Sequence, residues 1–156
     1  MKNNERKILL ELVEDGRKNI SDIAKKLGIS RQTVSKKIRG MEEKKIIDSF
    51  SVKIDEGRVG LNTKAYVILN IAPSSELRHR FVREAKKIEN ISQMHHTFGR
   101  FDMILEILVK DEKELDRTLD KIRDFEAVEE TETLICKYME KNDQKDPIRY
   151  ALEKDF

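Results

Sequence analysis

The residues with the clearest potential for recognition chemistry lie directly after Ser30. Glutamine can pair with an adenine edge through two hydrogen bonds, arginine can reach the O6 and N7 atoms of guanine, and serine can bond to a base or a phosphate. We therefore expect Arg31, Gln32 and Ser35 to read DNA bases. The predicted set of DNA-binding residues also includes Ser30, Thr33, Lys36, Lys37 and Arg39.

Basic residues farther along the same segment suit phosphates better than bases. They can neutralise the DNA backbone, which fixes register and supplies salt-dependent affinity. These residues are Lys36, Lys37, Arg39, Lys44 and Lys45. The alternative is that such charges only keep an amphipathic helix in solution. An N-cap serine, a turn glycine and a basic N-terminal face occur together here, and their coincidence favours the DNA-binding interpretation.

Three short helices are expected to position these side chains. Residues 4–13 carry apolar residues at helical spacing and form the first, and Ser21 is expected to cap the second, which ends at Gly28. Ser30 caps the third, which reaches about residue 43. One apolar stripe of the third helix is expected to face the core, through Val34, Ile38 and Met41. The opposite side then carries the polar residues, and the layout is that of a helix-turn-helix.

After the third helix the side-chain pattern changes to strict alternation. Apolar and polar residues alternate from Ile46 to Ile54, which predicts a β hairpin or wing. Gly57 and Gly60 then break the pattern and predict a linker. We therefore expect a winged helix-turn-helix domain (1–54), a linker (55–63), a second domain (64–140) and a C-terminal tail (141–156) whose packing the sequence does not reveal.

The second domain is expected to contain strands and helices in the order βαββαβ. Strands are predicted over residues 65–71, 91–98, 101–109 and 128–139. Ser74 or Ser75 would cap the first helix, and Asp111 the second. This order is that of the ferredoxin-like fold, in which both helices cover one face of an antiparallel sheet. The chain is thus predicted to be an α+β protein, and the open sheet face is expected to pair with a second subunit, giving a homodimer.

The composition of the chain narrows the possible partners. Residues 1–45 contain 13 Lys and Arg against 7 Asp and Glu, whereas residues 46–156 contain 19 against 23, so the net charge of +2 hides a basic N-terminal third. Double-stranded DNA is the expected partner of such a segment. The single cysteine, Cys136, permits no internal disulfide, and no apolar run approaches the roughly 20 residues that span a bilayer. We expect a cytoplasmic protein without membrane contact, metal or cofactor.

The chain resembles the Lrp/AsnC, or feast/famine, family of bacterial and archaeal transcription regulators. The resemblance covers nearly everything up to Met139 and rests on residues 23–30, 34–47, Gly60, the turn Gly99-Arg100-Phe101-Asp102 and residues 128–133. It implies that the second domain is a RAM domain. In this family RAM domains form dimers through their sheets, often build octamers and commonly bind an amino acid between dimers.

By the same resemblance, the effector site would include Gly99, Arg100, Phe101 and Asp102. The glycine would let the backbone approach a small ligand, neighbouring N–H groups could receive its carboxylate, and Asp102 could face its ammonium group. The alternative is an ordinary hairpin turn in which Asp102 bonds to its own backbone.

Three histidines, His79, His95 and His96, are the candidates for acid–base chemistry or haem contact. His95 and His96 are neighbours on a predicted strand, so they point to opposite faces and cannot hold one metal ion together in the usual way. The resemblance also has an enzymatic branch, the sirohaem decarboxylase subunits, in which basic and histidine side chains would hold a tetrapyrrole. The intact basic face of the third helix favours a sequence-specific regulator, and we expect no catalytic residues.

Overall fold

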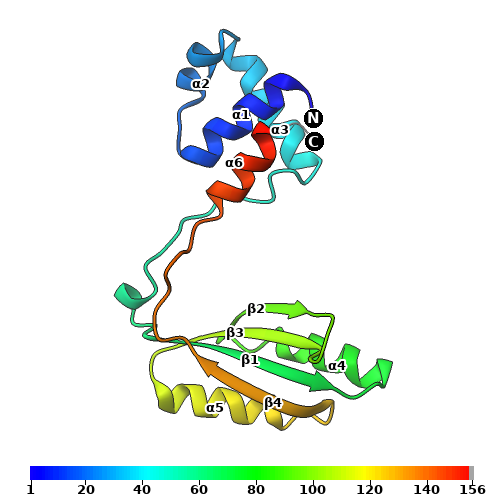
Figure 1. Cartoon of the computed structure of the whole chain (residues 1–156). Coiled ribbons are helices and arrows are strands. Elements are labelled where there is room, and N and C mark those ends of the chain that lie inside the picture. Colours follow the sequence, from blue (N-terminus) through cyan, green and yellow to red (C-terminus); the bar gives the residue numbers. More distant parts are fainter. Residues whose placement is uncertain (155–156) are drawn as a thin grey trace. The chain divides into compact units, whose positions relative to one another are not determined.

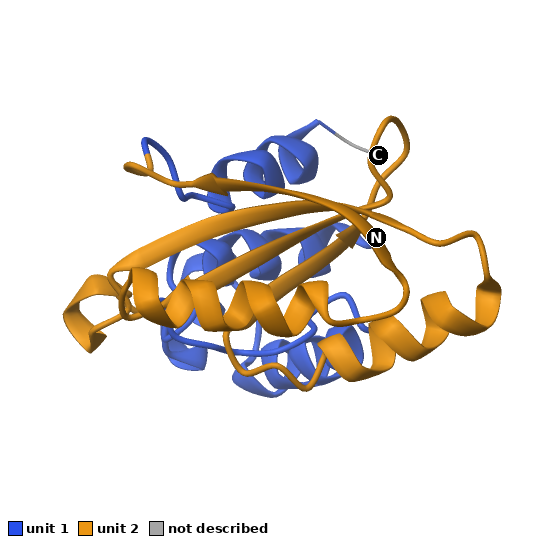
Figure 2. Ribbon diagram, turned by 90° about the horizontal axis from the view of Figure 1, so that it is seen from below, with its two compact units in different colours: residues 1–53, 140–156 blue, residues 54–139 orange. Residues whose placement is uncertain are grey.

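The computed structural model describes residues 1–154. Figure 1 labels its helices and strands in chain order. They form two compact units: residues 1–53 together with the segment from residue 140 onward, and residues 54–139 (Figure 2).

The N-terminal part of the first unit contains three helices, and their packing confirms the predicted helix-turn-helix. They are α1 (Asn3–Glu14), α2 (Ile20–Leu27) and α3 (Arg31–Glu43). Gly28 ends α2 in the left-handed conformation with φ 65°, which glycine adopts without strain. The Ser30 hydroxyl caps α3 by accepting a hydrogen bond from the Thr33 N–H at 3.1 Å. The core joins all three helices through buried Ile8, Ile23, Ala24, Val34, Met41 and Ile47.

The cap predicted for the second helix is wrong. The helix begins at Ile20, and the residue at the N-cap position is Asn19 rather than Ser21. The N–H groups of Asp22 and Ile23 donate to the Asn19 carbonyl at 3.0 and 3.1 Å. Ser21 therefore lies inside the first turn, where its side chain cannot act as the N-cap.

The β hairpin predicted from the alternation in residues 46–54 is also absent. Between α3 and the first strand, the described chain contains only a short 3₁₀ helix, Gly57–Val59. Phe50, Val52 and Ile54 are exposed, at 52%, 76% and 57%. A strand needs a hydrogen-bonded neighbour, and no described part of this chain supplies one, so the alternation produces no ladder here.

The C-terminal segment folds back onto the first unit. Its helix α6 (Lys145–Glu153) lies beside α1 in Figure 1. The Lys145 ammonium donates to the Glu14 carbonyl at 2.8 Å, and the Arg149 guanidinium pairs with the Glu14 carboxylate at 3.2 Å. Lys53 also donates to the Asn142 carbonyl. Sequence reasoning treated this segment as a separate tail, whereas the structure makes it part of the N-terminal unit.

The second unit confirms the predicted βαββαβ order. Its elements are β1 (Thr63–Ile71), α4 (Ser75–Ala85), β2 (Ile91–His96), β3 (Met103–Val109), α5 (Glu112–Arg123) and β4 (Val128–Ile135). The antiparallel sheet has the order β2-β3-β1-β4, as expected for a ferredoxin-like fold. Ser74 caps α4 and Asp111 caps α5, as predicted. Strand β2 ends at His96 and β3 begins at Met103, so both are shorter than expected at the turn between them, and β4 ends at Ile135 instead of residue 139. The chain leaves the sheet at these points.

Alternation in the two central strands separates a covered sheet face from an open one. In β1 and β3, alternate residues are buried against α4 and α5, beginning with Ala65 and Met103. Phe81 of α4 and Phe125 pack edge to face in this core, with ring centroids 5.2 Å apart. The opposite face is only partly covered within the described chain and carries Tyr66, Ile68, Ile104, Leu108 and Leu134.

Replacing Asp111 with alanine should destabilise the second unit by about 1 kcal/mol, because the Glu114 N–H loses its cap acceptor, 2.9 Å away. Equilibrium unfolding in urea, followed by circular dichroism, measures this change. Asp116→Ala is the matched control on the exposed side of α5, and its effect should stay within about 0.5 kcal/mol. Equal losses in both variants would contradict the capping role of Asp111.

Candidate functional site

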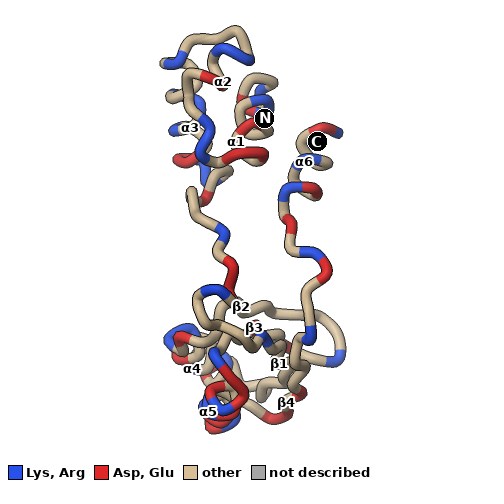
Figure 3. The backbone as a smooth tube through the Cα atoms, turned by 90° about the vertical axis from the view of Figure 1, so that its left-hand side faces the viewer, with Lys and Arg blue, Asp and Glu red and all other residues tan. Residues whose placement is uncertain are grey.

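The exposed side of α3 gathers most of the predicted DNA-binding residues. Val34 and Met41 are fully buried on the other side, which fixes which side of the helix is exposed to solvent. The exposed residues are Arg31, Gln32, Ser35, Lys36 and Arg39. Gln32, Ser35, Lys36 and Arg39 line one surface hollow together with Gly40 and Glu43. Figure 3 shows the positions of Lys and Arg along α2 and α3.

Three other predicted residues have partners inside the first unit. The Ser30 and Thr33 hydroxyls lie 2.8 Å apart at the start of α3. The Lys37 ammonium lies 3.4 Å from the carboxylate of Glu5, and the side chain of Lys37 is only 26% exposed. Lys37 therefore ties α3 to α1, whereas Lys36 is free to reach outward.

Glu5 is a residue that sequence reasoning missed. It accepts a hydrogen bond from the Lys2 N–H at 3.1 Å, and this bond is the main cause that lowers the pKa of its carboxyl group. Lys37 and, at 3.9 Å, Lys44 add to the same effect. A glutamate in the first turn of a helix is a recognisable capping signal. Its contact with α3 depends on tertiary packing, which no local pattern reveals.

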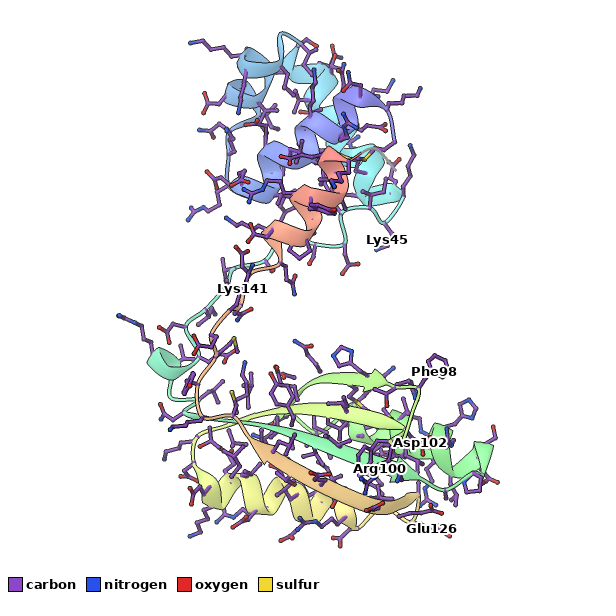
Figure 4. All side chains as sticks on the ribbon, viewed as in Figure 1. Lys45, Phe98, Arg100, Asp102, Glu126 and Lys141 are labelled. Atoms are coloured by element: carbon purple, nitrogen blue, oxygen red, sulfur yellow. The ribbon has the colours of Figure 1, made fainter. Side chains whose placement is uncertain are left out.

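The predicted effector residues lie in the turn between β2 and β3. Gly99 has φ 137°, a conformation that side-chain-bearing residues rarely adopt. The Arg100 guanidinium lies 5.0 Å from the centre of the Phe101 ring. The Thr97 N–H donates to the Asp102 carbonyl at 2.9 Å and closes the turn. Figure 4 labels Phe98, Arg100 and Asp102 in this hairpin.

Asp102 connects the turn to two neighbouring elements. Its carboxylate accepts the Ile71 N–H at 2.9 Å and the Arg78 guanidinium at 2.8 Å. The bond from Ile71, followed by that from Arg78, lowers the pKa of Asp102 below its ordinary value. The carboxylate of Asp102 therefore bonds to strand β1 and helix α4, and not to the backbone of its own turn as one sequence interpretation expected. Arg78, which also donates to the carbonyls of Ala72 and Ile71, was missed because its partners are distant in sequence.

Two of the three histidines, His79 and His96, line one hollow of the second unit, and His95 lies outside it. His95 lies 3.0 Å from the Gln93 amide, and the His79 ring nitrogen Nδ1 lies 2.7 Å from the Ser75 carbonyl. The hollow lies beside α4. Across residues 1–154 no three His, Cys, Asp or Glu side chains are grouped so that they could hold a metal ion.

Within the described part of the chain, no helix is both long enough and apolar enough to cross a bilayer.

A helix-turn-helix unit followed by a ferredoxin-like unit defines a class of DNA-binding transcription regulators with a ligand-binding domain. Family models agree with this assignment: residues 1–48 match the model described as winged helix-turn-helix DNA-binding, and residues 64–144 match the Lrp/AsnC ligand binding domain. The chain belongs to the Lrp/AsnC family of transcription regulators.

Two relatives illustrate the similarity in sequence. An uncharacterised HTH-type transcriptional regulator of Pyrococcus horikoshii is 32% identical over 133 residues, which cover 84% of this chain and 89% of the relative. An HTH-type transcriptional regulator of Mycobacterium tuberculosis is 31% identical over 133 residues, covering 83% and 86% of the two chains. The relatives span nearly the same length as this chain and are regulators by name.

Two solved structures illustrate the similarity in fold. An AsnC family transcriptional regulator from Agrobacterium tumefaciens matches with a TM-score of 0.87 at 24% identity, over 97% of this chain and 99% of that one. A transcriptional regulator from Neisseria meningitidis, solved as an L-Met complex, matches with a TM-score of 0.88 at 17% identity, over 96% and 98%. Both confirm the architecture of the two units.

Asp102→Asn should destabilise the protein at neutral pH, because the variant loses the ion pair with Arg78. The pKa of Asp102 is lower in the folded than in the unfolded chain, whose ordinary value is 3.8. The stabilisation is therefore complete above the unfolded value and is lost as the pH falls through the folded value. Thermal melts between about pH 7 and about pH 3 should show the difference between wild type and variant shrinking with acidification.

Asp116→Asn is the control for this pH series, since Asp116 is exposed on α5 and distant in sequence from the turn. Its difference from wild type should stay small at every pH. A constant Asp102→Asn deficit across the series would show that the ionised carboxylate is not what stabilises the turn.

Proposed function

We propose that the protein binds a pseudo-palindromic DNA site as a homodimer, with each α3 entering one of two major grooves about one helical turn apart. The observation that carries this proposal is the exposed polar and basic face of α3 on a helix whose other side is buried. Arg31, Gln32 and Ser35 read bases, and Lys36 and Arg39 contact phosphates. Lys37 helps to position α3 through its ion pair with Glu5, and it contributes to DNA binding less directly than Lys36 and Arg39.

The open face of the sheet supports the dimer. Tyr66, Ile68, Ile104 and Leu108 give it apolar surface that the described chain leaves partly exposed. Burying this face against its two-fold copy would remove apolar area from water. By family resemblance, such dimers assemble further into octamers. We place the regulator in the cytoplasm, and we assign it no catalytic role, because the relatives named above are regulators and none supports the tetrapyrrole-binding alternative.

Gln32→Ala and Lys36→Ala should affect DNA binding in different ways. On a preferred site selected from random duplexes, Gln32→Ala should cost about 1–3 kcal/mol and relax base preference at one position, because a bidentate base contact is lost. Lys36→Ala should weaken binding to every sequence by a similar factor and reduce the salt slope by about 1, because one phosphate contact is lost. Competition assays at several salt concentrations measure both effects.

Lys113→Ala, which removes an exposed charge from α5 in the other unit, is the control and should leave both quantities unchanged. Equal, sequence-independent losses in the Gln32 and Lys36 variants would refute the division between base reading and phosphate binding.

An amino acid is the effector we propose for the β2–β3 turn. The match to the Lrp/AsnC ligand binding domain and the L-Met complex of the Neisseria regulator support this proposal. Gly99 would allow the ligand close to the backbone, with Arg100 and Phe101 beside it. Because both oxygens of Asp102 already accept hydrogen bonds, its first task is to hold the turn, and the ligand ammonium would use its remaining lone pairs.

A thermal-shift screen with the common amino acids should reveal one or a few that raise the melting temperature, since a ligand at 100 times its Kd stabilises by about 2.7 kcal/mol. Gly99→Val should abolish the shift, because a β-branched residue is strained at φ 137°. Gly16→Ala, whose added Cβ would make an ordinary 3.8 Å contact with the Leu12 carbonyl, should keep it. If no amino acid shifts the melting temperature of the wild type, the effector proposal fails. The DNA-binding proposal does not depend on this result.

A further inference from the structure

A basic hollow of about 650 Å³ lies between helix α4 and the edge strand β2. Its lining residues are Pro73, Ser75, Arg78, His79, Val82, Arg83, Lys86 and His96. Five of these eight are arginine, lysine or histidine, and none is acidic. No residue of the Gly99–Asp102 turn lines it, so it is a different place from the proposed effector turn.

The spacing of residues along α4 explains why the bases collect on this side. His79, Arg83 and Lys86 follow one another at intervals of four and three residues, so they form one stripe on the helix. Leu77, Phe81 and Ala85, on another side, pack into the core beneath the sheet. The charges of Arg83 and Lys86 in this stripe repel one another, and an anion held between them would relieve that repulsion.

Several hydrogen-bond donors around the hollow remain available. Arg78 is already used by Asp102 and two backbone carbonyls, so it serves as a fixed wall. Arg83 bonds to Glu84 through Nε at 3.1 Å, which leaves its terminal nitrogens. His79 gives its Nδ1–H to the Ser75 carbonyl, so the Nε2 of its neutral ring accepts rather than donates, and His79 only contributes to the wall.

Two further donors have no protein partner. Among the described residues, no hydrogen bond or ion pair joins Lys86 or His96 to another group. Both side chains are exposed, so a ligand can reach them from solvent. Together with Arg83, they give donors from three side chains around one hollow.

We propose that this hollow binds the phosphate group of a small organic phosphate. A phosphate monoester carries about 1.5 to 2 negative charges at neutral pH and three strong acceptor oxygens, which suits donors from several side chains better than a single carboxylate would. Val82 and Pro73 supply apolar wall for the organic part of the ligand. The volume falls within the roughly 300–1,000 Å³ typical of small-molecule sites. This site goes beyond the proposed DNA and amino-acid binding and rests on neither.

Isothermal titration calorimetry of the full chain with inorganic pyrophosphate, at constant ionic strength, tests the proposal. Saturable binding is expected, and Arg83→Ala/Lys86→Ala should weaken it at least tenfold because two donors are lost. Arg80→Ala/Lys113→Ala is the matched control: it removes the same charge from exposed positions of the same unit, but neither residue lines the hollow, so affinity should stay within twofold. Lys86→Ala alone, at the exposed end of α4, provides a variant with little risk to folding and should weaken binding at least threefold.

Three results would overturn the proposal. The first is the absence of saturable heat with pyrophosphate. The second is an equal loss of affinity in the two double variants, which would indicate general charge attraction. In the third, Arg83→Ala/Lys86→Ala binds duplex DNA more weakly than wild type while pyrophosphate does not bind, which would make the hollow a nucleic-acid contact. Circular dichroism of each variant distinguishes loss of the site from loss of the fold.

Discussion

A helix of 13 residues in a small unit can bury only one of its sides, and this limit decides how the N-terminal unit can act. Val34 and Met41 are fully buried in the same cluster as Ile8 and Ile23, so the rotation of α3 about its axis is fixed. The direction of every polar residue on α3 follows from that rotation. Apolar packing therefore determines which side of α3 faces solvent.

The same packing divides the positive charges of the N-terminal unit into two groups. Glu11 holds the ammonium groups of Lys18 and Lys26 at 2.5 Å each, and Glu5 holds Lys37. These lysines are paired with largely buried carboxylates inside the unit. The net charge of residues 1–45 already counts these carboxylates, so the pairs change the location of the positive charge and not its amount. The unpaired basic residues on the exposed side of α3 are directed toward solvent, which suits recognition.

Short sequence patterns correctly predicted the helix caps and strands that depend on only a few neighbouring residues. The Ser30 and Asp111 caps and the alternation of β1 and β3 are properties of a few neighbouring residues, so they could be predicted from the sequence. Contacts between residues distant in sequence could not be predicted in this way. Nothing near Arg78 in the sequence indicates its ion pair with Asp102, and α6 contacts α1, which lies more than a hundred residues earlier. Residues 46–54 show the converse. Their alternation is a true strand pattern, yet a strand forms only where a partner strand exists, and the pattern does not say where that partner is.

Arg78 stands between the β2–β3 turn and the basic hollow, and its hydrogen bonds decide how the two places are related. Its guanidinium is occupied by the Asp102 carboxylate and by the carbonyls of Ile71 and Ala72, so it holds the turn against β1. An anion in the hollow that took the Nε or Nη2 donors of Arg78 would break these bonds and loosen the turn, whereas Nη1 makes none of them. The donors of Lys86 and His96 carry no such cost. The hollow can therefore be occupied while the turn keeps its geometry, which makes the two sites neighbours that share a wall but not their donors.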